Sequence, residues 1–504
     1  MDGLEQLFYG FSIALTPMNL LWALIGVTVG TIIGVLPGVG PVTGIAVLLP
    51  LTFGRDPASA LILLAGIYYG AMYGGSTTSI LANIPGESSS VMTAVEGYEL
   101  AKKGRGGAAL GIAAFGSFIA GTVGLVLLGF LAPTMAKLAI KFGPPEYFTL
   151  MTLSFTLVAA LSTNNIIKGL ISTVIGLMVS TIGIDRLTGE ARFTFGVIGL
   201  MDGIEFVVVA IGLFAVAEIL CNLEVMQIPI TQLKKFKVRE LLPSKSDWKE
   251  SIFPILRGSL VGFGIGCLPG GGATIGTFIT YGIEKAISKT KEKFGTGHMP
   301  AVAAVESSNN GSAAGGFIPL LTLGIPAGGS TAVLLGGFML LGISPGPTLF
   351  QLHPDVVWGL IASMYIGNVM LLILNLPLIS LFMQILRLPY AVMSLFICVL
   401  SVLGIYSLSN SLFSLWIMLL FGVLGYVMRK LDFPLPPLLL GTILGGMMEE
   451  ALRQSLSLSE GSWLIFFQRP ISLTLSAIFC IVTAFQVYHI IKHGAYKERE
   501  SDEA

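Results

Sequence analysis

The chain has 504 residues, of which 54% are hydrophobic and 11% charged, and its mean hydropathy is +0.86. Soluble domains carry about 25% charged residues, so this composition excludes a soluble protein and predicts an integral membrane protein. The formal net charge is zero and the basic residues stand in short loops between apolar runs, which argues against a nucleic-acid-binding protein. The four cysteines stand singly, without the spacing of metal ligands, so no metal site is expected.

The first residues, MDGLEQLFYGF, are acidic and lack the basic region and the small-residue cleavage site of a signal peptide. We therefore expect the first span to be retained. A span needs about 20 apolar residues to cross the hydrocarbon core. Uninterrupted apolar runs predict spans at 106–136, 146–161, 166–184, 203–222, 355–386, 390–408, 411–428 and 470–491. The stretch 433–469 is either one crossing or none.

Four other apolar segments are broken by proline and glycine, and they lie at 17–53, 58–85, 253–284 and 301–342. Helix breaks at membrane depth are tolerated only where the exposed backbone is buried in protein or lines a cavity. We therefore expect re-entrant hairpins or broken helices in these segments. The predicted fold class is all-α, a polytopic membrane protein with roughly 10–12 transmembrane helices besides the broken ones.

Two motifs in the broken segments occur twice. LPGVGPVTG aligns with LPGGGATIG at a spacing of 232 positions, and NIPGESS aligns with GIPAGGS at a spacing of 241. Paired segments of this kind are typical of a secondary transporter built from two repeats. We predict a first membrane repeat at 1–232, a basic cytoplasmic linker at 233–252, a second membrane repeat at 253–492 and a polar tail at 493–504.

The basic loops lie at 102–105, 234–249, 285–293 and 429–430, and the positive-inside rule places them in the cytoplasm. If each repeat begins with a hairpin that returns to its own side, the loop at Arg55 lies outside while its counterpart at 285–293 lies inside. The basic loop 102–105 also has a counterpart, 341–355, which contains no lysine or arginine. Equivalent loops thus fall on opposite sides, which predicts inverted repeats.

Each first motif follows a helix that has glycine at every fourth position. These glycines are Gly26, Gly30 and Gly34 in one repeat and Gly258, Gly262 and Gly266 in the other. We interpret them as helix-packing residues, because small side chains let helices approach closely in lipid. In the following LPGxG, proline breaks the helix and the glycines permit conformations that expose backbone N–H groups. Exposed amides at a helix start carry partial positive charge and suit an anion.

Neutral polar residues gather around the second motif, in GGSTTSILANIPGESSS and ESSNNGSAAGG, almost without cations. They form either packing contacts between helices or a site where hydroxyls and amides bind carboxylates while Asn309 and Asn310 hold a coupling cation. We favour the site, because the polar groups coincide with the breaks in both repeats. Glu306 is a cation ligand, a proton carrier or a cap, and we interpret Glu87 as a helix cap.

The candidate substrate-binding residues are Pro37, Gly38, Gly40, Thr43, Ser76, Thr77, Asn83, Pro269, Gly270, Gly272, Thr274, Asn309, Asn310, Gly328 and Ser330. The candidate cation-coupling residues are Glu306, Asn309 and Asn310. No cofactor is expected besides the coupling cation, which is Na+ or H+.

Enzyme signatures do not occur in the sequence. There is no GxxxxGK[ST] phosphate loop, and no apolar span offers a nucleophile with a positioned base. We therefore expect a protein that is not an enzyme. A passive anion channel remains the alternative to a transporter, because channels also use broken helices and bare carbonyls.

Several long motifs resemble the large membrane subunit of the tripartite tricarboxylate transporters, the TctA family. They are GVLPGVGPVTGIAVLLPLTF, GIYYGAMYGGSTTSILANIPGE, AVEGYELAKKGRGG and ESSNNGSAAGGFIPLLTLGIPAGGSTAVLLGG. The resemblance covers nearly the whole chain and is most specific at 34–107 and 262–347. It places the family's glycine-rich loops on 37–40 and 269–272 and its Asn-Asn pair on Asn309 and Asn310.

This resemblance implies a multi-pass protein of the bacterial inner membrane that imports a di- or tricarboxylate, such as citrate, by symport driven by an ion gradient. It also implies two partners, a small membrane subunit and a periplasmic substrate-binding protein. The chain departs from the family pattern at Glu87, which is followed by three serines, and at Ala327, Gly328 and Gly329. A carboxylate at Glu87 would repel a tricarboxylate, so either the substrate is less charged or the side chain faces solvent.

Overall fold

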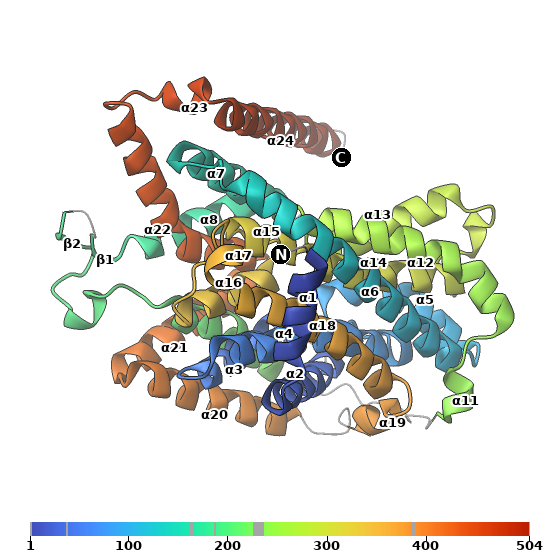
Figure 1. Ribbon diagram of the computed structural model, residues 1–504. Helices are drawn as coiled ribbons and strands as arrows, with labels where there is room; N and C mark the ends of the chain where they lie inside the picture. Colours follow the sequence, from blue (N-terminus) through green and yellow to red (C-terminus); the bar gives the residue numbers. More distant parts are fainter. Residues whose placement is uncertain are drawn as a thin grey trace. The chain divides into compact units, whose positions relative to one another are not determined.

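The computed structural model describes residues 3–36, 39–161, 166–185, 188–224, 236–384 and 390–502. Within these ranges the chain is helical almost throughout, and its strands form one small antiparallel hairpin (Figure 1). The chain divides into two compact units, one of residues 1–139 with 207–427 and one of 140–206 with 428–504. Each unit therefore combines segments from both halves of the sequence.

The first unit contains the four broken segments. Its elements are α1 (Gly3–Ala14), α2 (Pro17–Val35), α3 (Gly40–Leu48), η1 (Leu49–Thr52), α4 (Pro57–Ala82), η2 (Ser88–Ser90), α5 (Val91–Lys102), α6 (Gly106–Ala139), α9 (Phe206–Ala210), η4 (Ile211–Val216), α10 (Ala217–Glu224), α11 (Val238–Leu241), α12 (Lys245–Gly266), α13 (Gly272–Ile287), η5 (Lys291–Lys293), α14 (Met299–Gly315), α15 (Phe317–Leu323), α16 (Gly329–Leu340), α17 (Leu349–Leu352), α18 (Pro354–Asn375), α19 (Ile379–Phe382), α20 (Tyr390–Ser409) and α21 (Leu412–Lys430).

The second unit is smaller. Its elements are α7 (Pro144–Leu161), α8 (Ile166–Ser180), β1 (Gly183–Ile184), β2 (Ala191–Arg192), η3 (Ile198–Leu200), α22 (Leu435–Leu458), α23 (Ile465–Gln468) and α24 (Pro470–Asp502). The stretch 433–469, which the sequence left as one crossing or none, consists of α22 and α23. The second half of α22 carries Glu449, Glu450 and Arg453.

Eight helices among the described residues are long and apolar enough to cross a membrane. They span Pro17–Val35, Pro57–Ala82, Gly106–Ala139, Phe206–Glu224, Pro354–Asn375, Ala391–Ser409, Leu412–Lys430 and Pro470–Tyr488. Gly40–Thr52, Ile166–Ser180 and Gly329–Leu340 are shorter apolar helices. These helices confirm the predicted all-α, polytopic membrane fold.

The helices break where proline and glycine cluster. Segment 17–53 divides into α2, α3 and η1, segment 253–284 into α12 and α13, and segment 301–342 into α14, α15 and α16. In segment 58–85, α4 runs without interruption to Ala82, so its break lies at the end. Helix α12 begins at Lys245, inside the predicted linker. The proposed repeat boundaries themselves stay a prediction.

The glycine stripes pack one helix directly on the backbone of another. Helix α2 lies against α4, and α12 lies against α14 (Figure 1). A Cβ atom at Gly30 would stand 2.4 Å from the carbonyl oxygen of Ile67, and one at Gly262 would stand 2.2 Å from that of Ser308. Real Cβ atoms do not approach oxygen this closely, so the stripes are confirmed as packing surfaces.

The same packing occurs in both repeats, residue by residue. Gly30 and Gly262 are separated by 232 positions, and their contacts, Ile67 and Ser308, are separated by 241. Four further pairs of glycine contacts obey the same offsets: Gly26 on Leu63 and Gly258 on Ala304, Gly34 on Ala71 and Gly266 on Ser312, Gly70 on Val27 and Gly311 on Ser259, and Gly74 on Thr31 and Gly315 on Phe263. The α2–α4 and α12–α14 pairs are therefore equivalent structures.

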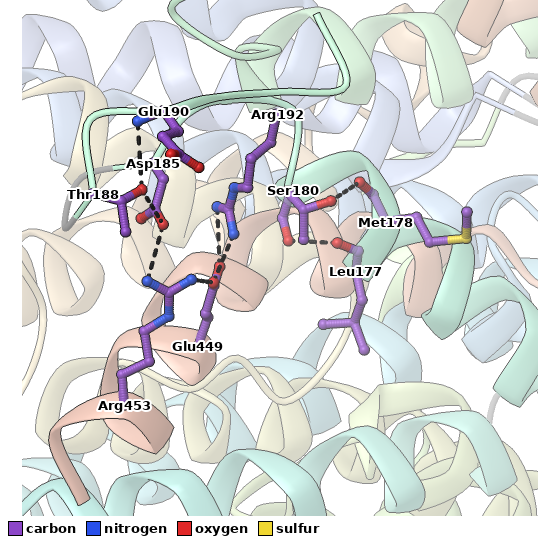
Figure 2. Close-up of polar contacts among 10 residues, drawn as sticks. Leu177, Met178, Ser180, Asp185, Thr188, Glu190, Arg192, Glu449 and Arg453 are labelled. Carbon is purple, nitrogen blue, oxygen red and sulfur yellow. Dashed lines mark hydrogen bonds and ion pairs between the residues drawn. The ribbon is translucent and has the colours of Figure 1, made fainter. Parts of the chain in front are cut away.

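In the second unit, charged residues fix the hairpin to α22. Figure 2 shows Arg192 on β2 directed at Glu449, with N···O distances of 2.7 and 3.2 Å. Arg453 bridges Glu449, at 2.6 Å, and Asp185, at 2.9 Å. The Arg192–Glu449 and Arg453–Asp185 contacts join residues that are more than 250 positions apart in the sequence. The cluster therefore holds the 183–192 hairpin against one face of α22.

The ion cluster predicts acid sensitivity of the hairpin. Hydrogen bonds from Arg192 lower the pKa of Glu449 below its usual value of 4.5. A carboxyl whose pKa is lowered by folding stabilises the folded state above 4.5, and this contribution is lost as the pH falls through the folded pKa. We expect amide protection in the hairpin to fall in acid by the equivalent of up to ~1 kcal/mol. Hydrogen exchange, corrected for intrinsic rates, checks this.

Glu449→Gln is the matched variant for that measurement. It keeps the shape of the side chain and removes its charge, so its hairpin is expected to be less protected at neutral pH and less sensitive to acid. Equal acid sensitivity in the variant and the parent chain would contradict a role for this carboxylate.

Candidate functional site

The second motif ends a helix in the same way in both repeats. Asn83, after α4, has a φ of 57°, and Gly324, after α15, has a φ of 68°. Both residues are in the left-handed region that terminates helices. The next residue donates a backbone hydrogen bond in each case, from Ile84 N to Thr78 O at 3.4 Å and from Ile325 N to Pro319 O at 3.1 Å. All three positions obey the 241-residue offset.

The chain then enters a new helix with the same local hydrogen bonds. Ser90 Oγ donates to Glu87 O at 2.8 Å, and Thr331 Oγ1 donates to Gly328 O at 2.9 Å. Glu87 and Gly328 are equivalent positions, and so are Ser90 and Thr331. The two breaks thus have one backbone design, with a carboxylate at one break and no side chain at the other.

The first motif also has a matched backbone. Gly40 and Gly272, which begin α3 and α13, have φ values of 63° and 49°, and Gly270 has a φ of 76°. Only glycine adopts such values without strain. Pro269 lies in the turn between α12 and α13, whereas Pro37 and Gly38 lie outside the described residues.

Two contacts bring the breaks together, one between the repeats and one within the second repeat. Ser88, which follows the break after α4, shares a hydrogen bond of 2.8 Å with Thr274 on α13. A Cβ atom at Gly328 would stand 3.8 Å from Gly272 Cα, so the turns before α13 and α16 lie side by side. The structure therefore brings Gly272, Thr274 and Gly328, all predicted site residues, into one region.

Glu306 is a carboxylate in the interior of the first unit, with 0% exposure. Its Oε2 accepts hydrogen bonds from Ser76 at 2.6 Å and from Ser117 at 3.5 Å, and its Oε1 accepts one from Thr93. These hydroxyls come from α4, α5 and α6, so Glu306 on α14 joins helices of the first repeat. Every partner is neutral.

Asn309 and Asn310 are buried one turn further along α14, with 1% and 0% exposure. Asn309 Nδ2 donates to Glu87 Oε1 at 3.1 Å and, more weakly, to Met72 O at 3.5 Å. Asn310 Nδ2 donates to Glu306 O at 3.3 Å. Both Oδ1 atoms are buried without a hydrogen-bond partner within the described part of the chain. Buried oxygens of this kind are rare and suit a ligand.

The other predicted residues lie in different surroundings. Thr77 lines a cavity of about 10 Å³ beside Ser76 and Ser117, which is close to the room that one water needs. Ser330 is buried at the start of α16. Asn83 is exposed at the end of α4. Thr43 donates to Phe214 O, in the π-helical segment η4, at 3.1 Å, which places its hydroxyl on a structural contact.

Sequence reasoning missed Thr93 and Ser117 as partners of Glu306. No spacing signals them, because they stand 213 and 189 positions from it. Glu87 precedes η2, which is the position of a cap, yet its carboxylate also contacts Asn309. Glu87 is half-buried and in contact with Asn309, so its side chain does not face solvent alone.

The electrostatics of this region are unbalanced. Among the described residues, neither Glu87 nor Glu306 forms an ion pair. Removing an ion from water costs several kcal/mol unless a partner compensates. Either a proton or a metal cation can neutralise these carboxylates, and the glycine turns nearby have exposed backbone groups.

Two known proteins are similar to this chain. The chain is 46% identical over 486 residues to an uncharacterized 52.8 kDa protein in the TAR-I ttuC' 3' region of Agrobacterium vitis, and the match covers 96% of each chain. It is 42% identical over 222 residues to an uncharacterized protein in the TAR-II ttuC' 3' region of the same organism, covering 44% of this chain and 92% of the relative. No solved structure matches the chain significantly.

A family model also matches residues 20–440, a range that contains every candidate site residue. Its class is a transporter, which fits a protein that is not an enzyme and gives no support to the anion channel. The chain is thus a multi-pass membrane protein that belongs to the tripartite tricarboxylate transporter TctA family.

Proposed function

We propose that this protein is the large membrane subunit of an ion-gradient-coupled symporter that imports a di- or tricarboxylate, citrate-like in its chemistry, across the bacterial inner membrane. Membership of the TctA family supports a role in transport. One observation supports a coupled mechanism: among the described residues, Glu87 and Glu306 form no ion pair. They lie close to Asn309 and Asn310, whose side-chain oxygens have no hydrogen-bond partner there.

The proposed mechanism is alternating access between two inverted repeats. The matched packing of α2 on α4 and of α12 on α14 supports the idea of two equivalent halves. Broken helices at the interface of such halves present helix starts to anionic groups and carbonyls or amides to cations. The substrate carboxylates would be held by the turns at Gly272 and Gly328 and by the hydroxyls of Thr274 and Ser330.

The family name also implies further subunits. We propose a small membrane subunit and a periplasmic substrate-binding protein as partners. Such a binding protein would deliver the carboxylate to the outer face and make uptake dependent on its presence.

Reconstitution tests this function. Proteoliposomes containing both membrane subunits are supplied with the binding protein, labelled citrate or a dicarboxylate, and a Na+ or H+ gradient. Accumulation that requires both the gradient and the binding protein is the expected result. Flux that needs neither would overturn the coupled mechanism.

Replacing Asn310 with alanine is expected to reduce uptake about tenfold, which corresponds to ~1.4 kcal/mol of binding. The variant removes a buried oxygen that has no partner in the described part of the chain, so membrane insertion should be unaffected. Asn222→Ala is the matched control, because Asn222 Nδ2 also donates to a carbonyl four residues earlier, at 3.0 Å. Normal uptake by the Asn310 variant would contradict its assignment.

A further inference from the structure

We propose that Glu87 and Asn309 form a sodium site, so that the two halves of the centre have different tasks, with the coupling cation held at the break after α4. This inference rests on the proposed function, which it deepens by naming the ion and a ligand that the sequence had assigned to capping. Three observations support this site: the repeats differ in their carboxylates, one buried oxygen has no partner in the described ranges, and the carboxylates have no cationic partner there.

The asymmetry appears when equivalent positions are compared. Glu87 at one break corresponds to Gly328 at the other, although the surrounding backbone hydrogen bonds are the same. On the long helices, Glu306, Asn309 and Asn310 of α14 correspond to Ala65, Tyr68 and Tyr69 of α4. The carboxylates and carboxamides of the centre therefore have no counterparts in the other half.

Two of those side chains meet across the repeats. Glu87 follows α4 in the first repeat, and Asn309 belongs to α14 in the second, yet Asn309 Nδ2 and Glu87 Oε1 are 3.1 Å apart. The equivalent pair would be Tyr68 and Gly328, which cannot supply a carboxylate. One side of the centre thus has the negative ligands, and the other has open space at Gly328, where a Cβ atom would have only Gly272 within 4 Å.

The unpartnered oxygen points to a ligand at this place. Asn309 is 1% exposed, and its Oδ1 has no hydrogen-bond partner in the described ranges, although its Nδ2 is held by Glu87. An amide oxygen buried in this way costs about 1–3 kcal/mol unless something binds it. A hard cation with oxygen ligands would satisfy Asn309 Oδ1 and the Glu87 carboxylate together once the carboxamide turns its oxygen, in place of Nδ2, toward Glu87.

The charge balance points to the same ion. Glu87 accepts the amide of Asn309, and Glu306, one turn before Asn309 on α14, accepts three hydroxyls, so every side-chain partner of the two carboxylates is neutral. A substrate carboxylate would add further negative charge. A sodium ion between Glu87 and Asn309 lowers this repulsion, which makes binding of the anion depend on binding of the cation.

The test measures sodium binding by the full chain without substrate. Purified protein in lipid nanodiscs is titrated with NaCl against choline chloride at constant ionic strength, and the thermal midpoint is recorded. A ligand that binds the folded state raises the midpoint with concentration. We expect stabilisation by Na+, and a decrease in apparent Na+ affinity of about tenfold or more in Glu87→Gln and Asn309→Ala.

Three variants keep the result interpretable. Gly264→Ala adds a Cβ that meets nothing within 4 Å, at a position outside the proposed site, so it should retain the Na+ response. Glu292→Gln removes an exposed carboxylate in the first unit and should also retain it. Glu87→Asp keeps the charge and should bind Na+ better than Glu87→Gln, which remains informative if the glutamine variant folds poorly.

An Na+ response that is the same in Glu87→Gln and the parent chain would overturn the site, as would a parent chain that does not respond to Na+. Uptake of carboxylate is measured separately in proteoliposomes. A response that depends on Glu87, in a protein without coupled uptake, would leave the site standing and refute the transport proposal. Coupled uptake without a Glu87-dependent Na+ response would support the transport proposal and overturn the site.

Discussion

Replacing Gly262 with alanine is expected to destabilise the first unit by about 3 kcal/mol and to lower the yield of folded protein severalfold. The new Cβ atom would stand 2.2 Å from Ser308 O and 2.6 Å from Ser308 Cα, which are backbone atoms of α14 and cannot turn aside. The two helices would have to separate along the whole glycine stripe. Yield after gel filtration and thermal unfolding in detergent measure the effect.

Gly264 provides the matched control on the same helix. A Cβ atom there meets nothing within 4 Å, and alanine is the better helix former by ~1 kcal/mol, so Gly264→Ala should be neutral or slightly stabilising. The repeat predicts the same loss of stability at the equivalent position. Gly30→Ala should destabilise the unit as Gly262→Ala does, because its Cβ would stand 2.4 Å from Ile67 O. A Gly262 variant as stable as the Gly264 variant would contradict the packing argument.

Replacing Glu306 with glutamine is expected to reduce ion-coupled uptake by about tenfold or more, equivalent to at least ~1.4 kcal/mol of coupling. Glutamine keeps the volume of the side chain, and the hydroxyls of Ser76 and Thr93 can rotate to donate or accept, so the fold should persist. What is lost is the carboxylate of Glu306, which is buried and has no cationic partner in the described ranges. Initial uptake rates at a fixed gradient check the prediction.

Ser117→Ala is the control for Glu306. Its hydroxyl contacts the same carboxylate but at 3.5 Å, the limit of a hydrogen bond, so its loss should change uptake little. Glu306→Ala should be worse than Glu306→Gln, because it leaves three hydroxyls and a cavity behind. Coupled uptake at the parent rate in Glu306→Gln would show that this carboxylate is no part of the coupling.

The positions of the helix breaks were accessible from the sequence. LPGxG and the Pro-Gly of the second motif interrupt helices through local chemistry, namely the missing proline N–H and the backbone freedom of glycine. The exception is segment 58–85, where Gly74-Gly75 lies within α4 but the helix continues to Ala82, because its only proline, Pro57, is at the first position. The glycine stripes were also readable, because their spacing is the spacing of one helix face.

The partners of the polar residues were not accessible in this way. Glu306 was a candidate for three roles, and its contact with Ser76 links positions 230 apart. Glu87 looked like a cap because capping is a local property, whereas its contact with Asn309 depends on how α4 and α14 cross. No local pattern encodes such a crossing.

The sequence by itself determined a membrane protein with two copies of one broken-helix design. Hydropathy, proline and glycine act locally, and the repeat offsets of 232 and 241 can be read by aligning the two halves of the sequence. Only the tertiary structure decided that equivalent glycines pack on equivalent carbonyls, and that Glu87 and Asn309 meet while Gly328 leaves its position open. The physical reason is that burial and charge compensation belong to the packed helices, not to any one segment.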